Sequence, residues 1–467
     1  MATVEDEVLD AARYLREVRP LDPTELREYV TDRPPAAEIR SILRSHAWSL
    51  RLVETPAGRF EPVDRTPVTS PTAPTDRLPR ELSEVLIGWL RETFDPEWAS
   101  GRTGDRLRAR VDELKAAYLR VGTTRYEDEA DAAAYLVYHF PRSYAATTFV
   151  LGELIAGAGL PRTLRVLDVG AGVGAHLAAL TDALPDDALV RYEAIEPTPS
   201  AAVLSHLEDA YCGPNVHVRL RDRPIEALNI EGSFDLVMLG NVLSELDEPA
   251  AVARRTFEVV AADGAWVGIA PADPRTSTQL YDVARNLEPP ATVYGPDLRL
   301  WPDRRPTDEH WAFVEGPPIE VPAFQRRLAA AAPAADRRSY RNDEVRFSYE
   351  ILRRDGTRRY DVLGHRDRQL PLSSAAEAVG TRVNVVAVKL TRDLAEGDNA
   401  LYRIGDGSQS TPWFASLVNP ASTNRLLANA PHGAVLSFER VLVLWNDDEA
   451  AYNAVVDEEV LVTQLAP

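Results

Sequence analysis

From residue 163 onward, short apolar runs rich in leucine and β-branched residues alternate with segments that have helical apolar spacing. The runs predict strands at Leu164–Val169, Val190–Ile195, Val216–Arg221, Phe234–Leu239 and Ala265–Ala270, with helices such as 199–211 and 248–262 between them. The later stretch "VRFSYEILRR", 345–354, predicts one more strand of the same sheet. Such alternation predicts an α/β fold with a parallel sheet and right-handed crossovers, which binds ligands at the carboxyl ends of its strands.

The segments before this core are predominantly helical. Residues 1–61 combine three short helical patterns with a hairpin turning at Pro56-Ala57-Gly58, which predicts a winged-helix-like unit or, equally, a helical docking module. Residues 33–51 form a locally basic stretch, because their only acid is Glu38 and they contain four arginines, Arg33, Arg40, Arg44 and Arg51. We expect a Pro/Thr-rich linker at 62–80, a helical lead-in at 81–160 and the core domain at 161–375.

The C-terminal part, 381–467, reads as five strands with a short helix between the third and the fourth. That order is typical of an OB-fold barrel. Tyr402, Trp413 and Phe414 fall on the second and third strands, where such barrels stack nucleic-acid bases. The segment nevertheless holds six basic and eleven acidic side chains, a net charge of −5. The alternative is that the aromatic residues simply fill a small barrel.

Composition limits the setting. The chain has 467 residues and a formal net charge of −20, and only Lys115 and Lys389 are lysines, which argues against holding nucleic acid by bulk electrostatics. No apolar stretch is long enough for a membrane span and the acidic start is no signal peptide, so we expect a cytoplasmic protein. The single cysteine, Cys212, excludes an intrachain disulfide, and His139, His310 and His432 lack metal-ligand spacing. We expect no metal site, and oligomeric state is left open.

The stretch "TLRVLDVGAGVGAHLAAL", 163–180, places glycines where the first core strand passes into a helix. Glycines there allow a sharp turn and close backbone approach to a ligand. Gly170, Gly172 and Ala175 satisfy a dinucleotide fingerprint, whereas Asp168, Gly170, Gly172 and Gly174 satisfy the pattern acid-x-G-x-G-x-G of S-adenosylmethionine loops. The second pattern uses every constrained position. It also accounts for Asp168, whose carboxylate can pair with the ligand's α-ammonium but would repel a pyrophosphate.

Two further acids end the next two strands. Glu196 can accept both ribose hydroxyls, and Asp222 can accept from the adenine amino group. Gly240 and Asn241, after the fourth strand, would flank the methionine moiety. The predicted cofactor is S-adenosylmethionine, and its predicted binding residues are Asp168, Gly170, Ala171, Gly172, Gly174, Glu196, Pro197, Asp222, Gly240 and Asn241.

Four segments resemble the methyltransferase-like proteins of mitochondrial small-ribosomal-subunit assembly and their prokaryotic homologues. They are "YHFPRSYAATTFVLGEL", "VLDVGAGVG", "FDLVMLGNVLSEL" and "NDEVRFSYEIL", within residues 130–362. The resemblance implies a class I S-adenosylmethionine fold acting on or near small-subunit ribosomal RNA, with ribosomal RNA or the small subunit as partner. It carries the family's cofactor positions over to Asp168, Gly170, Gly172, Gly174 and Glu196.

The chain departs from that family in one respect. Many members hold an iron–sulfur cluster by cysteines after the fifth strand, whereas the matching stretch here, 292–316, has none and carries Ala312 at one such position. We expect a metal-free insertion beside the cofactor cleft, packed by Trp301, Trp311 and Phe313.

The residues give less guidance on catalysis. The place of an amino-methylation motif reads "GNVLSEL", 240–246, leaving Asn241 and Glu245 as candidates, although Glu245 also suits a capping or surface role. Cys212 lies away from the cleft and is no expected nucleophile. Residues 337–368 hold ten arginines and six acids around Tyr340, Phe347, Tyr349 and Tyr360, an RNA-facing surface or a solvated hairpin. Three hypotheses stand: a ribosomal RNA methyltransferase, a non-catalytic RNA-binding assembly factor that keeps the cofactor, and a small-molecule methyltransferase.

Overall fold

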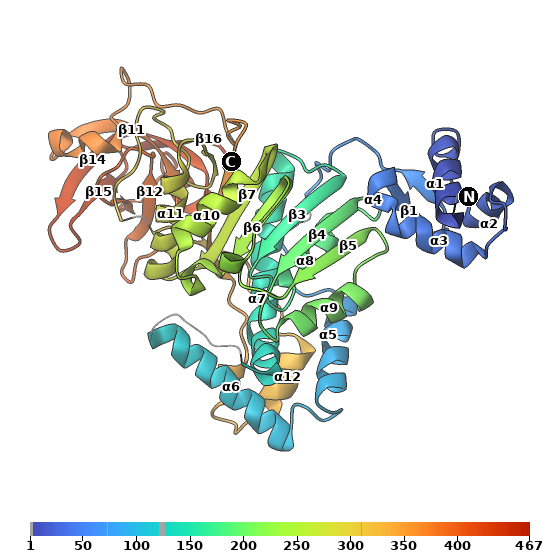
Figure 1. The fold of residues 1–467 in the computed structure, drawn as a ribbon. Coiled ribbons are helices and arrows are strands. Elements are labelled where there is room, and N and C mark those ends of the chain that lie inside the picture. The colour runs from blue at the N-terminus through green and yellow to red at the C-terminus, as the bar shows by residue number, and fades with distance from the viewer. Residues whose placement is uncertain (1–2, 72, 121–126, 310) are drawn as a thin grey trace. The chain divides into compact units, whose positions relative to one another are not determined.

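A computed structural model (Figure 1) describes residues 3–71, 73–120, 127–309 and 311–467. The contacts within the chain group it into two compact units. The first unit comprises Met1–Met238 and Pro318–Asp343, and the second comprises Leu239–Pro317 and Glu344–Pro467. Among the described residues, no helix is long and apolar enough to cross a membrane. The finer division of the chain at 61, 80, 160 and 381 stays a prediction.

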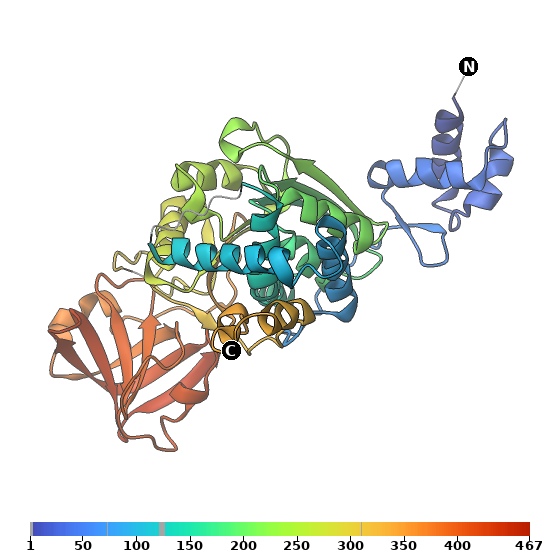
Figure 2. The same cartoon turned by 90° about the horizontal axis from the view of Figure 1, so that it is seen from below.

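The first unit begins with the predicted helices and hairpin, seen in blue in Figure 2. They are α1 (Val4–Leu15), α2 (Pro23–Leu26), α3 (Ala36–Ser45), α4 (Ala47–Leu50), β1 (Leu52–Glu54) and β2 (Phe60–Pro62). Thr3 caps α1, and one core of apolar side chains, among them Val8, Ile39 and Phe60, joins helices and hairpin. The predicted basic face is largely neutralised, because Arg33 pairs with Glu28 while Arg40 and Arg44 both pair with Glu54.

Three longer helices follow: α5 (Arg80–Thr93), α6 (Gly101–Arg120) and α7 (Glu129–Gly157). Asp128 starts α7 with a capping box, and the helix continues through Pro141 with most of its side chains buried. Residue 72 of the predicted linker and residues 121–126 of the lead-in lie outside the described residues.

The parallel sheet of the first unit is formed by β3 (Thr163–Val169), β4 (Leu189–Ile195) and β5 (Val216–Arg221), with β4 in the middle. Helices α8 (Ala175–Ala183) and α9 (Ala201–Ala210) connect them, and α7 packs on α8. The bounds of the three strands agree with the predicted runs to within one residue. β6 (Phe234–Gly240) begins in this unit and ends in the second, and α12 (Ala323–Ala330) also belongs to the first unit.

The second unit continues with α10 (Pro249–Glu258), β7 (Val260–Pro271), α11 (Pro274–Leu287), β8 (Thr292–Gly295), β9 (Val314–Glu315) and β10 (Arg346–Arg353). β10 is the strand predicted from "VRFSYEILRR", and it runs antiparallel to β7, β8 and β9. The sequence did not indicate β8 and β9, because runs of four and two residues carry no readable alternation.

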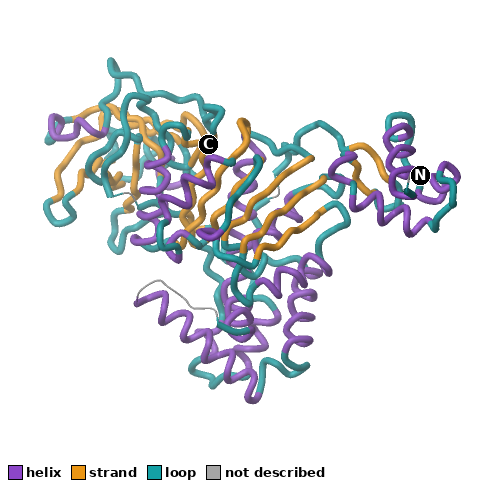
Figure 3. The backbone as a smooth tube through the Cα atoms, in the orientation of Figure 1, coloured by secondary structure: helices purple, strands orange, loops and turns teal. Residues whose placement is uncertain are grey.

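A closed barrel ends the chain, with its strands drawn in orange in Figure 3. Its elements are β11 (Arg382–Lys389), β12 (Ala400–Gly405), β13 (Trp413–Leu417), α13 (Leu426–Asn429), β14 (Val435–Asn446), β15 (Ala451–Val456) and β16 (Leu461–Ala466). β12 pairs with β11 and β13, β13 pairs in parallel with β15, and β14 pairs with both β15 and β11 and so closes the ring. This order, with α13 between β13 and β14, confirms the predicted OB-like barrel.

Two details of the barrel differ from expectation. The predicted fifth strand is two strands, because the chain turns at Asp457, which accepts the Glu459 N–H and pairs with Arg382, and β16 then pairs with β14. Tyr402 and Trp413 are 4% and 0% exposed, so they fill the barrel and offer no stacking platform, while Phe414 is half-buried. The alternative interpretation of these aromatic residues, as barrel core, is the right one for Tyr402 and Trp413.

The insertion at 292–316 packs against the barrel. Leu298, Leu300 and Trp301 share one cluster with side chains of β11 and β14, and the Trp301 indole N–H donates to Asp406 at 2.6 Å. Phe313 is buried as expected, whereas Trp311 is only half-buried. The packing partner is therefore the barrel, and the position of the insertion beside the cofactor cleft stays a prediction.

Candidate cofactor site

The loop between β3 and α8 has the backbone that its glycines allow. Gly170, Gly172 and Gly174 have φ angles of 69°, 55° and 81°, all in the left-handed region that other residues avoid. Gly174 is also crowded, because a Cβ there would lie 2.8 Å from Leu207 Cδ1 of α9. At Gly172, a Cβ would meet nothing nearer than the Gly170 carbonyl oxygen at 3.9 Å. The loop therefore presents open backbone at Gly172 and packed backbone at Gly174, a shape that admits a ligand close to the chain.

The loop is fixed to the end of β4. The N–H groups of Gly170 and Ala171 both donate to the Ile195 carbonyl oxygen, at 2.9 and 3.2 Å. Ala171 is 3% exposed, so its side chain anchors the turn. Glu196 directly follows Ile195, the last residue of β4, so the glycine loop and the Glu196 carboxylate are held close together.

Glu196 is bonded to the loop itself. One carboxylate oxygen accepts the Gly172 N–H at 2.7 Å, and the other accepts both the N–H and the hydroxyl of Thr198, at 3.0 and 2.5 Å. Glu196 is 5% exposed, and burial raises the pKa of its carboxyl group against the lowering effect of these bonds. Its expected contact with ribose hydroxyls stays a prediction, as does any contact of the exposed Pro197.

Asp168 has an environment that the sequence did not reveal. The carboxylate is 0% exposed and accepts a hydrogen bond from the Tyr192 hydroxyl, and its two oxygens lie 3.1 and 3.2 Å from His176 Nδ1. Burial alone lowers the pKa of His176, but the Asp168 charge and hydrogen bond outweigh it and raise that pKa. Asp168 is thus held between β4 and α8 behind the loop. Its expected pairing with the ligand's α-ammonium stays a prediction.

The other predicted site residues are placed separately. Asp222 is exposed, directly after β5. In the second unit, β6 ends at Gly240, and Asn241 has a left-handed φ of 59° with its N–H donating to the Ile269 carbonyl oxygen at 2.8 Å. Glu245 is exposed on a short 3-10 turn (Leu243–Glu245). The described contacts thus bring together the glycine loop and Glu196, with Asp168 behind, while the contributions of Asp222, Asn241 and Glu245 stay predictions.

Cysteine and histidine chemistry contributes little. Cys212 is half-buried with its Sγ 3.6 Å from the Thr181 hydroxyl, and burial raises its thiol pKa to about 11, which disfavours a nucleophilic thiolate. His139 and His432 are half-buried, and their burial lowers the pKa of both. His310 lies outside the described residues. Among the residues that the structure describes, no three His, Cys, Asp or Glu side chains are grouped to hold a metal ion.

The arginine-rich segment 337–368 is mostly satisfied within the protein. Arg338 pairs with Asp343, Arg353 with Asp355 and Arg366 with Asp303. Tyr340, Phe347 and Tyr349 are 7%, 3% and 1% exposed, so these rings cannot stack on bases in this arrangement, and only Tyr360 is half-exposed. Residues 346–353 form the buried strand β10, so the alternative of a solvated hairpin is wrong for them, and these pairings do not favour the RNA-facing surface.

Three parts of the chain match described protein families. Residues 167–266 match a methyltransferase domain, and residues 5–56 and 373–465 match the N-terminal and C-terminal domains of a domain of unknown function, DUF8157. No curated protein sequence matches the chain. The methyltransferase match spans the glycine loop, Glu196 and Asn241, and it agrees with the parallel-sheet core and with S-adenosylmethionine as the cofactor.

Solved structures similar to the chain include several methyltransferases. The N-methyltransferase NodS from Bradyrhizobium japonicum in complex with S-adenosyl-L-homocysteine is 15% identical, with 52% of this chain and 98% of NodS covered and a TM-score of 0.31. The plantazolicin methyltransferase BpumL with the same ligand is 10% identical, with coverage of 58% and 95% and a TM-score of 0.30. Mitomycin 7-O-methyltransferase MmcR is 18% identical, with coverage of 58% and 76% and a TM-score of 0.24.

Proposed function

We propose that the chain is an S-adenosylmethionine-dependent methyltransferase. The observation that carries the proposal is the loop geometry. Gly170, Gly172 and Gly174 all have left-handed φ angles, the space beside Gly172 is open, and the Gly172 N–H donates to the Glu196 carboxylate. A side chain at Gly172 would occupy the open space that a close-lying ligand needs, so these residues fit the cofactor. The methyltransferase match over residues 167–266 supports the same assignment.

The chain's own residues suit this cofactor better than a dinucleotide. Glu196, directly after β4, suits the ribose of either cofactor, whereas Asp222 after β5 adds negative charge at the carboxyl edge of the sheet, which attracts a sulfonium and an ammonium and repels a pyrophosphate. The bound cofactor supplies an activated methyl group, and the protein's task is to place the acceptor in line with it. In this proposal Asp168 joins β3 to β4 and α8 behind the loop through Tyr192 and His176, and its pairing with the ligand's α-ammonium stays a prediction.

For the methyl acceptor, charge and burial favour a small molecule. The net charge of −20, the paired arginines of 337–368 and the buried rings of Tyr340, Phe347 and Tyr349 all leave little for RNA to bind. The second candidate is small-subunit ribosomal RNA, as enzyme or as non-catalytic assembly factor. It rests on the family resemblance of the segments at 138–154 and 342–352; α7 contains the first, and β10 contains residues 346–352 of the second.

Binding and turnover test these proposals separately. Titration of the purified chain with S-adenosylhomocysteine and, in parallel, NAD⁺ is expected to show saturable binding of the first alone; binding of NAD⁺ alone would overturn the cofactor assignment. Modified bases in small-subunit ribosomal RNA are then mapped in a deletion strain. We expect an unchanged pattern. Loss of one modification, restored by the wild type but not by a Gly172→Ala variant, would establish the ribosomal RNA candidate in its catalytic form.

A further inference from the structure

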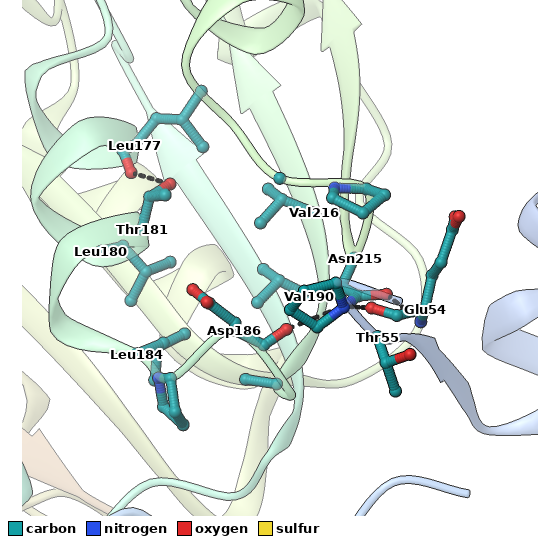
Figure 4. A pocket seen from close by; sticks show the side chains of 15 residues that line it. Glu54, Thr55, Leu177, Leu180, Thr181, Leu184, Asp186, Val190, Asn215 and Val216 are labelled. Atoms are coloured by element: carbon teal, nitrogen blue, oxygen red, sulfur yellow. Dashed lines mark hydrogen bonds between the residues drawn. The ribbon is translucent and has the colours of Figure 1, made fainter. Parts of the chain in front are cut away.

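Asn215 joins the N-terminal hairpin to the amino-terminal edge of the sheet. Its side-chain oxygen accepts the Glu54 N–H at 2.7 Å, and its amide nitrogen donates to the Glu54 carbonyl at 3.0 Å and to the Asp186 carbonyl at 2.7 Å (Figure 4). Asn215 is 4% exposed. Because the amide binds both backbone groups of Glu54, it holds β1 as a neighbouring strand would. The contact is therefore specific and does not depend on apolar packing alone.

A cavity of about 240 Å³ lies beside this contact. Four parts of the chain line it: the turn after β1, α8 with the turn that follows it, the start of β4 and the start of β5 (Figure 4). Its walls are mainly aliphatic, formed by Leu177, Leu180, Leu184, Val190, Pro214 and Val216. Protein interiors leave few voids larger than a water molecule, and a dry apolar cavity of about 150 Å³ already binds benzene. The present cavity exceeds that benzene-binding cavity by about the volume of a second, smaller ring.

The lining also excludes charged ligands. None of the described lining residues is basic, so an anion would find no counter-charge. Glu54 lines the cavity, but its carboxylate pairs with Arg40 and Arg44, and Asp186 is exposed to solvent. A cation would therefore lose its hydration without a buried, unpaired acid to replace it. The chemistry that fits is uncharged and mainly apolar.

We propose that this cavity binds a small, uncharged, mainly apolar molecule about the size of a bicyclic aromatic, and that the bound molecule stabilises the docking of the N-terminal helices and hairpin on the sheet. The second part follows from the lining, because residues of both the hairpin turn and the sheet contact the space. A ligand that needs both walls binds the docked form alone and stabilises it by mass action. The glycine loop follows the carboxyl end of β3, whereas the cavity lies at the amino ends of β4 and β5, so the site is distinct from the proposed cofactor site.

Indole is the probe, used with the full chain and without cofactor. Gly213 is an exposed residue of the cavity lining, and a Cβ there would meet nothing within 4 Å, so Gly213→Val adds a side chain at the mouth of the cavity without a clash. Gly397→Val is the matched control, because its Cβ also meets nothing within 4 Å and it belongs to the barrel. Calorimetry is expected to show one indole per chain for the wild type and the control, and at least tenfold weaker binding for Gly213→Val. Equal binding by all three, or no saturable binding by the wild type, overturns the site.

A second variant and a second readout cover the remaining outcomes. If Gly213→Val does not fold, Pro56→Trp, on an exposed turn residue of the lining, fills the mouth from the hairpin side and is expected to weaken indole binding equally. For the docking, hydrogen exchange at the Glu54 amide, which donates to Asn215, is expected to slow at least tenfold with saturating indole. Exchange at Glu54 unchanged by bound indole would contradict the stabilised docking.

Discussion

His176 Nδ1 lies 3.1 Å from the Asp168 Oδ1 atom, and both side chains are buried, at 4% and 0% exposure. Asp168 is on β3 just before the glycine loop, and His176 is on the first turn of α8 just after it. The pair therefore closes the base of the loop, with the Tyr192 hydroxyl of β4 as a second donor. We infer that the loop's shape depends on this pair as much as on its glycines.

Removing the histidine should be costly. In His176→Leu the buried Asp168 carboxylate loses the histidine and keeps its hydrogen bond from the Tyr192 hydroxyl. Breaking a buried pair in this way lowers the free energy of unfolding by about 3 kcal/mol or more. His46 pairs with Glu5 at 2.7 Å on the surface, so His46→Leu is the control and should cost no more than about 1 kcal/mol. Urea denaturation of both variants measures the difference. Equal losses would show that the buried pair contributes nothing special.

The same pair should make stability depend on pH. The Asp168 charge raises the pKa of His176 above its ordinary value of 6.5, so the folded chain binds this proton more tightly than the unfolded chain. The stabilisation is therefore complete below pH 6.5 and is lost as pH rises through the folded-state pKa. We expect the difference in unfolding free energy between wild type and His176→Leu to shrink as pH rises from about 6 to about 9. A difference that stays constant over that range contradicts the account.

The barrel aromatic residues should behave as core. Trp413 is 0% exposed between Leu372 and the β12 side chains, and its indole N–H donates to the Leu372 carbonyl at 3.2 Å. Trp413→Ala should cost about 3–5 kcal/mol, whereas Trp445→Ala, at 41% exposure, should cost far less. Guanidinium denaturation measures both. A Trp413 variant with wild-type stability and weakened binding to single-stranded RNA would instead restore the base-stacking interpretation.

The hydrogen bond between the insertion at 292–316 and the barrel should depend on the charge of its acceptor, the Asp406 carboxylate. The Trp301 indole donates to Asp406, which is 0% exposed and also accepts the Leu372 N–H at 2.8 Å, and burial raises the Asp406 pKa to about 6. Trp301→Phe should therefore cost about 1.5–3 kcal/mol. Trp266→Phe is the matched control: its indole donates to the neutral Thr256 hydroxyl at 3.1 Å, and we expect a cost of about 1 kcal/mol. Calorimetric unfolding compares the two, and a larger loss in the control would contradict the charged contact.

Where the sequence carried a local signal, it predicted the structure well. β3, β4 and β5 agree with their apolar runs, and the left-handed angles at Gly170, Gly172 and Gly174 are what the glycine spacing indicated. The barrel order follows from strand patterns and one short helix. In each case the residues that decide the conformation lie next to one another in the chain.

The sequence could not show which residues contact one another across the fold. His176 and Tyr192 read as ordinary helix and strand residues, and only the packing of β4 and α8 around β3 brings them to Asp168. Nothing in the sequence indicated the role of Asn215, whose amide holds Glu54 at a separation of 161 residues. The sequence left the arginines of 337–368 open as an RNA-facing surface or a solvated hairpin, because it does not show which acids they pair with: Asp343 and Asp355 are near in the chain, whereas Asp303, the partner of Arg366, is distant.

The central claim, that the loop at Gly172 binds the cofactor, is tested most directly by calorimetry with S-adenosylhomocysteine on two alanine variants. Gly172 and Gly101 have φ angles of 55° and 57°, and a Cβ at either meets little or nothing, so Gly172→Ala and Gly101→Ala carry the same backbone strain of about 1–2 kcal/mol. We predict one bound ligand per chain for the wild type and for Gly101→Ala, and at least tenfold weaker binding for Gly172→Ala. Absence of binding by the wild type, or equal affinity in all three proteins, would contradict the claim.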